Sequence, residues 1–219
     1  MSAEVRRMFA SIARRYDAAN QVLSLGVHRG WRRAAVRLSG AREGDRVLDC
    51  ATGTGDLASE FRRAGARVTG ADFCLPMMQA ARERSAFVAA DALLLPFRDR
   101  QFDICSIAFG IRNVDDPLRC LREMARVVRL QGRVVVLEFG QPRGAFGALF
   151  RAYSSKVMPL VGGALTGNRA AYEYLPRTAA AFPAGERFLD LMREADCFSS
   201  AKATPLTLGT AFVYVGTVR

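Results

Sequence analysis

Short apolar runs alternate with helix-like segments through the middle of the chain. The runs have the length of strands, and in the segments between them apolar residues recur every three or four positions. The expected strands are 46–50, 66–71 (ending at Asp72), 86–89, 102–108 and 132–139. The expected helices between them are 56–64, 75–84 and 117–129. This alternation predicts a parallel sheet with helices on its faces and right-handed crossover connections.

The two ends of this alternating core are elaborated. Residues 4–16 and 29–39 carry apolar side chains at helical spacing, which predicts two helices before the first strand. After the fifth strand, residues 141–184 hold glycines, prolines and three tyrosines around an apolar-rich stretch from Ala145 to Leu165. We expect the first 40 residues to form an N-terminal helical cap and residues 141–184 to form an inserted lid over the substrate.

The chain is expected to end in a helix and a hairpin. The helix is predicted at 185–195, and the hairpin strands at 198–204 and 210–218, so the final strand runs antiparallel to the sheet. A chain of 219 residues fits one domain with a substantial core. The fold class is therefore α/β, a single Rossmann-like domain over 1–219 with an antiparallel terminal strand.

A glycine-rich turn directly follows the first expected strand. The stretch Val47–Asp56 runs from an apolar strand through Asp49 into Thr52-Gly53-Thr54-Gly55 and then into a helical pattern. Glycines allow a sharp turn and the close approach of a ligand, and free N–H groups at the start of a helix attract polar ligands. The turn therefore predicts a nucleotide-type cofactor site.

Two classes of cofactor fit this turn. Gly53-x-Gly55-x-x-Ala58, with Asp72 about 20 residues further on, also matches the dinucleotide-binding fingerprint, so NAD stays open on these residues. Asp49 and Asp56 would lie close to the pyrophosphate of a dinucleotide and repel it. S-adenosylmethionine (SAM) carries a sulfonium and an ammonium group and no phosphate. Charge matching therefore favours SAM.

Further acids follow the later strands, and ligands of open α/β sheets bind beyond the carboxyl ends of the strands. Asp72, followed by Phe73, ends the second strand, where its carboxylate can accept bonds from ribose hydroxyls. Asp91 and Ala92 follow the third strand, near the adenine, and Ala108 ends the fourth beside the reactive centre. Each acid alone fits a helix cap or a loop equally well. Acids at three successive strand ends, together with the terminal hairpin, favour a class I methyltransferase site over an NAD site.

Composition limits the possible partners and the cellular compartment but does not indicate a function. The net charge is +11, and since only Lys156 and Lys202 are lysines, 30 of the 32 basic residues are arginines. A basic surface is attracted to anionic membranes or nucleic acids, but an ordinary solvated surface fits as well. The arginines are spread along the chain without a stacking-aromatic motif, so no nucleic-acid partner is expected, and an RNA methyltransferase is the alternative. The five cysteines are scattered, so no metal site is expected. The same spacing is typical of a protein in the reducing cytoplasm.

The motifs resemble one family nearly end to end. The sequence is similar to the ubiquinone/menaquinone biosynthesis C-methyltransferases, whose most specific match is Phe109-Gly110-Ile111-Arg112-Asn113-Val114. The other matching segments are 8–17, 23–32, the glycine turn, 71–73, 136–139 and 171–175 leading to 182–183. One departure is Leu130-Gln131-Gly132, a predicted turn where the family usually has Pro-Gly-Gly. The resemblance implies SAM-dependent methylation of a ring carbon of a prenylated quinol, foremost demethylmenaquinol to menaquinol, with the ubiquinone precursor as the other candidate.

The resemblance also implies catalytic residues. Arg112 and Asn113 follow the fourth strand, and Tyr16, Asp17 and His28 come from the N-terminal helices. Arg112 can stabilise a developing phenolate or position a water that acts as base. His28 has the pKa of a proton shuttle, although a lone histidine between helices is more often a structural residue.

The lid implies a membrane-linked substrate. A prenyl chain needs an apolar groove, and the lid carries apolar residues with Arg143, Arg151 and Lys156 for anionic headgroups. The apolar candidates are Phe146, Leu149, Phe150, Tyr153, Val157, Met158, Leu160 and Val161. We expect a cytoplasmic protein with transient peripheral contact at the inner face of the membrane. The alternative role for this segment is packing or formation of a homodimer.

Overall fold

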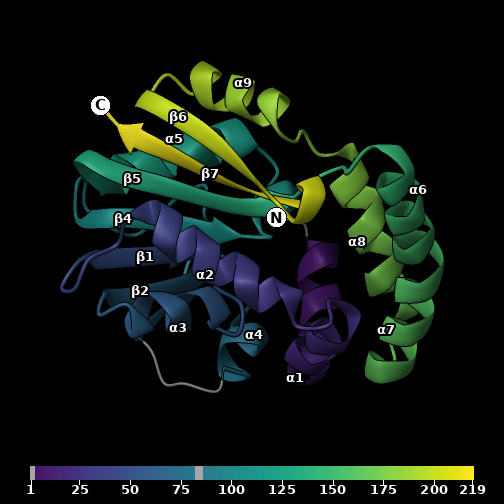
Figure 1. The fold of residues 1–219 in the computed structure, drawn as a ribbon. Coiled ribbons are helices and arrows are strands. Elements are labelled where there is room, and N and C mark those ends of the chain that lie inside the picture. Colours follow the sequence, from purple (N-terminus) through teal and green to yellow (C-terminus); the bar gives the residue numbers. More distant parts are fainter. Residues whose placement is uncertain (1–2, 82–85) are drawn as a thin grey trace.

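The computed structural model describes residues 3–81 and 86–219, and the described strands form one seven-stranded sheet (Figure 1). Its order is β3-β2-β1-β4-β5-β7-β6. The strands are β1 (Arg46–Cys50), β2 (Arg67–Asp72), β3 (Ala86–Ala89), β4 (Phe102–Ala108), β5 (Val128–Phe139), β6 (Phe198–Leu206) and β7 (Ala211–Val218). The first five are parallel, and β7 lies antiparallel between β5 and β6. The predicted α/β sheet with an antiparallel end is confirmed.

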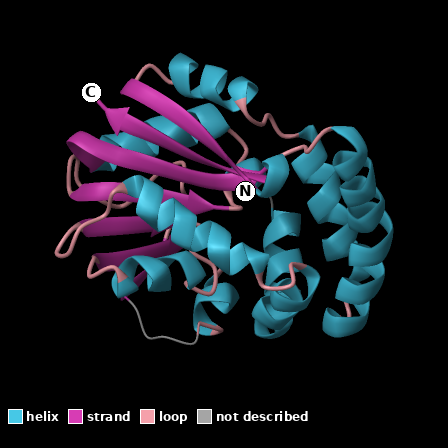
Figure 2. Cartoon of the chain, in the orientation of Figure 1, coloured by secondary structure: helices cyan, strands magenta, loops and turns pink. Residues whose placement is uncertain are grey.

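Helices cover both faces of this sheet and one of its ends (Figures 1 and 2). The α-helices are α1 (Ala3–Leu23), α2 (Val27–Ser39), α3 (Asp56–Arg63), α4 (Leu75–Gln79), α5 (Pro117–Val127), α6 (Gly144–Ala152), α7 (Met158–Thr166), α8 (Arg169–Ala181) and α9 (Glu186–Glu194). A 3-10 turn, η1 (Ile111–Asn113), follows β4, a π-helical turn, η2 (Tyr153–Val157), joins α6 to α7, and a 3-10 turn, η3 (Thr207–Gly209), joins β6 to β7.

The two faces of the sheet form two apolar layers because successive strand residues point to opposite sides. Val47 and Ile104 pack in the layer beneath α2 and α3, whereas Leu48 and Cys105 pack in the layer beneath α5 and α9. All four side chains are fully buried. Strands covered on both faces read as continuous apolar runs, which is why the sequence pattern located them.

The N-terminal cap and the lid pack together beyond one end of the sheet. Ile12 and Leu23 of α1 share an apolar cluster with Tyr172 of α8, and Met158 and Val161 of α7 pack against it. In Figure 1 these helices stand as one group beside the ends of β4 and β5. The residues predicted as cap and lid therefore enclose the edge of the sheet where the glycine turn lies.

Several element boundaries differ from the sequence prediction. The first helix extends to Leu23 rather than residue 16, because the apolar positions Ala19 and Leu23 continue its buried face. The helix expected over 75–84 ends at Gln79, and residues 82–85 lie outside the described residues. The predicted turn at 130–132 lies inside β5, where Gln131 has a φ of 60° and the register with β4 shifts. Across the described residues no helix is long and apolar enough to cross a bilayer.

Candidate active site

The glycine turn connects β1 to α3 and is fastened to the neighbouring strand. Gly53 and Gly55 adopt φ values of 56° and 81°, which glycine reaches without steric cost. The Gly53 N–H donates to Asp72 Oδ2 at 2.7 Å, and the Cys74 N–H donates to Asp72 Oδ1 at 2.7 Å. Burial raises the pKa of Asp72, and these backbone bonds counteract the rise. Asp72, at the end of β2 as the sequence predicted, therefore holds the backbone of the glycine turn in place.

Asp49 forms the buried acidic floor of the same turn. Its side chain is 1% exposed, and its two oxygens accept bonds from Thr52 Oγ1 and Ser106 Oγ, each at 2.7 Å. Burial raises the pKa of Asp49 to about 6, while the two hydroxyl bonds act in the opposite direction. Asp49 thus places negative charge beneath the turn near neutral pH.

A first cavity opens above this turn, with a volume of about 670 Å³ including its mouth. Among the predicted cofactor residues, six line it: Asp49, Thr52, Gly53, Thr54, Asp72 and Ala108. Two predicted catalytic residues, Tyr16 and Asn113, line it as well. The structure therefore brings together most of the positions that the sequence selected from four separate segments.

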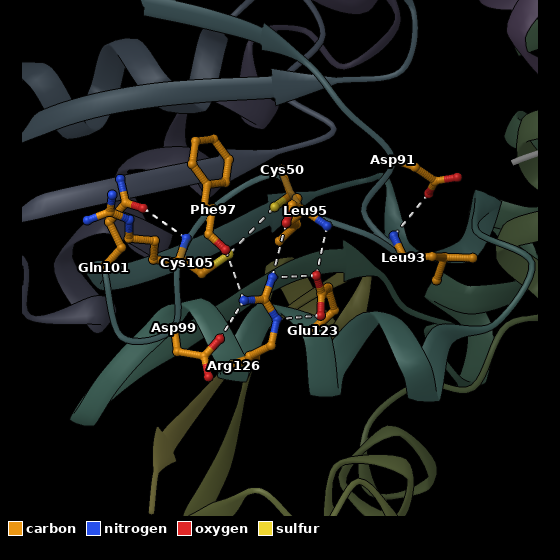
Figure 3. Close-up of polar contacts among 11 residues, drawn as sticks. Cys50, Asp91, Leu93, Leu95, Phe97, Asp99, Gln101, Cys105, Glu123 and Arg126 are labelled. Carbon is orange, nitrogen blue, oxygen red and sulfur yellow. Dashed lines mark hydrogen bonds and ion pairs between the residues drawn. The ribbon is translucent and has the colours of Figure 1, made fainter.

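Four predicted cofactor residues do not line this cavity. Gly55 shapes the turn, and the ring of Phe73 lies 5.2 Å from the guanidinium carbon of Arg6. Asp91 and Ala92 begin the loop after β3, and Asp91 Oδ1 accepts a bond from the Leu93 N–H at 2.9 Å. Figure 3 shows this short contact at one side of the loop. Their role in binding the cofactor remains a prediction.

The same loop is anchored on α5 by Arg126. Its guanidinium donates to the carbonyl oxygens of Phe97 and Leu95 at 2.9 and 3.0 Å and to Asp99 at 2.6 Å (Figure 3). Glu123 pairs with Arg126 at 2.7 Å and accepts the Leu95 N–H at 2.7 Å. These bonds fix the backbone between β3 and β4 and so the position of Asp91 near the strand ends.

Backbone strain marks the border of the first cavity. Ala51 and Phe109, at the ends of β1 and β4, have φ values of 47° and 54° although neither is glycine. Such conformations cluster at functional sites. The two segments also approach closely, since a Cβ on Gly110 would lie 2.7 Å from the Ala51 Cβ. This approach explains the glycine in the Gly-Ile-Arg-Asn motif.

A second, mostly apolar cavity adjoins the first. The two share Tyr16, Arg32 and Phe109. The second is also lined by His28 and Arg112, by Trp31 of α2, by Phe139 at the end of β5, and by Phe150 and Tyr153 of the lid. A third, apolar groove shares Phe139, Phe150, Met158 and Leu175 with the second and continues along the lid. The three hollows adjoin one another, because each shares lining residues with the next from the glycine turn to the lid.

A buried ion pair supports Arg112 at the second cavity. Arg112 Nη1 donates to Glu138 Oε1 and to the Phe109 carbonyl oxygen, each at 2.7 Å, and the two side chains are 3% and 1% exposed. Burial raises the pKa of Glu138, and the Arg112 charge opposes that rise. Glu138 stands in the matched segment 136–139, but no role for it was predicted from the sequence. An acid at the end of an apolar strand was the available signal.

Other predicted residues hold the cap and lid against the site. Thr54 Oγ1 donates to Asp17 Oδ1 at 2.7 Å, which ties α1 to the glycine turn. Asn113 Oδ1 accepts a bond from Tyr174 Oη at 3.0 Å, which ties α8 to η1. Tyr174 is a second residue to which the sequence analysis gave no role, although it stands in the matched segment 171–175.

His28 is neutral in this environment. Burial, followed by the charge of Arg32, lowers the pKa of His28 to about 4. Its Nδ1 contacts Ser24 Oγ, and the Ser24 hydroxyl donates to the Asn20 carbonyl oxygen at 2.7 Å. Because that hydroxyl proton is already used, Nδ1 must carry the proton of the imidazole, and Nε2 is left as an acceptor.

Solved methyltransferases share this fold. A SAM-dependent methyltransferase from Thermotoga maritima aligns with 97% of this chain and 99% of its own, at a TM-score of 0.72 and 22% identity. A second, from Aquifex aeolicus, covers 86% of this chain and 89% of its own at a TM-score of 0.60 and 15% identity. The architecture is that of the SAM-dependent methyltransferases.

Sequence comparison identifies the family within that class. The ubiE/COQ5 methyltransferase family matches residues 1–218. The ubiquinone/menaquinone biosynthesis C-methyltransferase UbiE of Bdellovibrio bacteriovorus is 51% identical over 98% of this chain and 96% of its own. The demethylmenaquinone methyltransferase of Thermus thermophilus is 46% identical over 95% of this chain and 99% of its own. The chain belongs to the ubiE/COQ5 methyltransferase family, which confirms the resemblance found in the sequence.

Proposed function

We propose that this methyltransferase moves the methyl group of SAM to a ring carbon of a prenylated quinol, foremost demethylmenaquinol. The observation that carries the proposal is the contact between two chemically different cavities, an acidic one at the glycine turn and an apolar one that holds Arg112. The names of the similar proteins, which cite both menaquinone and ubiquinone, point to the same reaction.

The first cavity suits SAM in charge and shape. Asp49 and Asp72 are buried acids that favour cationic groups, and acids outnumber the single described cation, Arg32, in the lining of the cavity. Thr52, Gly53, Thr54, Asp72 and Ala108 would hold the cofactor, with Asp72 toward the ribose. When bound, SAM supplies an electrophilic methyl group.

The second cavity suits the quinol ring. Phe109, Phe139 and Trp31 provide flat apolar contacts, and Arg112 supplies a fixed positive charge among them. A phenolic oxygen that loses its proton would be stabilised by Arg112, and the electron-rich ring carbon would then attack the methyl group. Close positioning and exclusion of water by the lid would supply much of the rate enhancement.

The reaction releases one proton in all: the phenol loses its proton before the attack, the methylated carbon loses its ring proton afterwards, and the oxygen then takes a proton back. The neutral imidazole of His28 lines the second cavity and would accept a proton there, but its pKa of about 4 makes it a weak base for this step. Asn113 and Tyr16, at the first cavity, would orient the reacting groups, and Asp17 would hold Thr54 in place.

The apolar groove along the lid would take the prenyl chain. At the outer surface Leu149 and Leu160 are 69% and 59% exposed, and Arg151 and Lys156 lie exposed in the same segment. Exposed apolar side chains next to basic ones are typical of peripheral contact with anionic membranes. We therefore extend the proposal to transient docking of the lid on the cytoplasmic face of the membrane, with a homodimer as the alternative use of this surface.

The acceptor can be identified by competition. The protein is incubated with SAM labelled in the methyl group and an equal mixture of reduced demethylmenaquinone and the reduced ubiquinone precursor, and the products are separated by chromatography. We expect label in the menaquinol. Label only in the ubiquinol precursor would correct the acceptor, and label in neither, while a reference methyltransferase of the family labels one, would refute the proposal.

A further inference from the structure

Arg32 of α2 carries a buried donor for which the described part of the chain supplies no acceptor. The residue is 7% exposed, and its Nη2 contacts Asp56 Oδ2 at 3.1 Å. Its guanidinium carbon lies 5.9 Å from the centroid of the Phe109 ring. The other terminal nitrogen, Nη1, is buried and has no hydrogen-bond partner among the described residues. Buried polar groups are nearly always paired, so an unpaired guanidinium nitrogen on a residue that lines a cavity indicates a missing acceptor.

The charge of the first cavity indicates which acceptor is missing. Among the described residues that line it, Arg32 is the only cationic one, facing the acids Asp49, Asp56 and Asp72. Those acids match the sulfonium, the ammonium and the ribose hydroxyls of SAM, but none of them matches the α-carboxylate of its methionine part. That carboxylate needs a positively charged donor once it leaves water.

We infer that Arg32 Nη1 binds the α-carboxylate of the cofactor and so sets the direction of its methionine arm. The inference rests on the proposed placement of SAM in the first cavity. Arg32 also lines the second cavity, together with Tyr16 and Phe109. A carboxylate held at this junction would place the neighbouring methyl group toward the quinol ring, while Asp56 keeps the guanidinium in position.

The second cavity offers a competing acceptor, a phenolic oxygen of the quinol. A carboxylate is the stronger acceptor for guanidinium because both partners are charged. The two possibilities also differ in what they predict without substrate. If Arg32 serves the carboxylate, its loss weakens binding of the cofactor product alone, whereas a role toward the quinol leaves that binding unchanged.

The test measures binding by calorimetry in the absence of quinol. S-adenosylhomocysteine is compared with its carboxamide, which keeps the nucleoside, sulfur and ammonium and lacks only the carboxylate charge. We expect the wild-type protein to bind the acid about 10- to 100-fold more tightly than the amide. Arg32→Gln should lose that preference, with little change for the amide. Arg37→Gln, an exposed charge change on the same helix, should keep the preference.

Several outcomes decide the matter. Equal affinities of the wild-type protein for acid and amide would overturn the inference, and this comparison needs no variant that must fold. An unchanged preference in Arg32→Gln would overturn it as well, whereas partial recovery in Arg32→Lys would support it. Asp72→Asn tests the proposed placement of SAM separately. If the affinity for S-adenosylhomocysteine does not change in this variant, SAM does not bind in the first cavity. If affinity falls in Asp72→Asn but Arg32→Gln keeps its preference for the acid over the amide, only the role of Arg32 is refuted.

Discussion

The ion pair between Arg112 and Glu138 gives the sharpest prediction for stability and turnover together. The atoms are 2.7 Å apart and both side chains are almost fully buried, so neither charge can be solvated if its partner is removed. Removing one member of a buried pair costs about 3–5 kcal/mol, because the remaining charge stays uncompensated. A domain of this size has a total stability of about 5–15 kcal/mol. Glu138→Ala should therefore leave a protein close to the limit of folding.

The size of the effect can be checked by thermal and urea unfolding. At about 2–4 °C per kcal/mol for a chain of this length, Glu138→Ala should lower Tm by about 6–20 °C. Glu138→Gln keeps an oxygen that can accept from Arg112 Nη1, so its loss should be smaller, about 1–3 kcal/mol. Glu173→Ala, which breaks an exposed pair with Arg169, is the matched control and should change stability by less than about 1 kcal/mol.

Turnover separates a positioning role of Glu138 from a purely structural one. Below the melting temperature, Glu138→Gln should bind S-adenosylhomocysteine normally and lose at least about tenfold in kcat, because a neutral amide holds the Arg112 guanidinium less firmly than the carboxylate does. A loss below about 1 kcal/mol in Glu138→Ala would refute the argument from burial. Normal kcat in a folded Glu138→Gln would refute the positioning role.

Four further predictions follow from the same geometry. Arg112→Ala should retain affinity for S-adenosylhomocysteine but lose about 100-fold or more in kcat; equal kcat would show that its assigned role is wrong. Because the pKa of His28 is about 4 in the folded protein and 6.5 in the unfolded chain, its contribution to stability is complete above pH 6.5 and lost as the pH falls toward 4; urea midpoints across this range should vary less in His28→Asn. Because the pKa of Asp49 is about 6, affinity for the cationic cofactor should weaken as the pH falls below 6, and titration calorimetry should find this dependence absent in Asp49→Asn. Replacing Leu149 and Leu160 together with serine should reduce co-sedimentation with anionic vesicles and leave methylation of a detergent-solubilised quinol unchanged; unaltered co-sedimentation would favour the homodimer.

The fold was predictable from the sequence because its signals are local. Each central strand is buried on both faces and therefore has an apolar run as its sequence. The start of helix α5 is indicated by Pro117 and by Asp116, whose carboxylate accepts a bond from the Arg119 N–H. The ends of an element could not be predicted where contacts with distant parts of the chain determine them. Cap helix α1 continues to Leu23 only because the lid covers its last turns.

The candidate site was predictable where motif and strand end coincide. Asp49, Asp72 and Ala108 reach one cavity because parallel strands bring their carboxyl ends to the same edge. Glu138 and Arg32 were missed because their partners lie 26 and 24 positions away and meet them only after folding. A charged residue in an apolar segment indicates burial, but the sequence pattern does not tell which distant group compensates the charge.

The reaction itself can be followed with SAM that carries a trideuterated methyl group. The protein is supplied with this SAM and with demethylmenaquinone in either the reduced or the oxidised form, and the product is analysed by mass spectrometry and NMR. We expect that only the reduced quinol reacts and that the labelled methyl is bonded to a ring carbon. A methyl group on the phenolic oxygen, or equal reaction of the oxidised quinone, would contradict it.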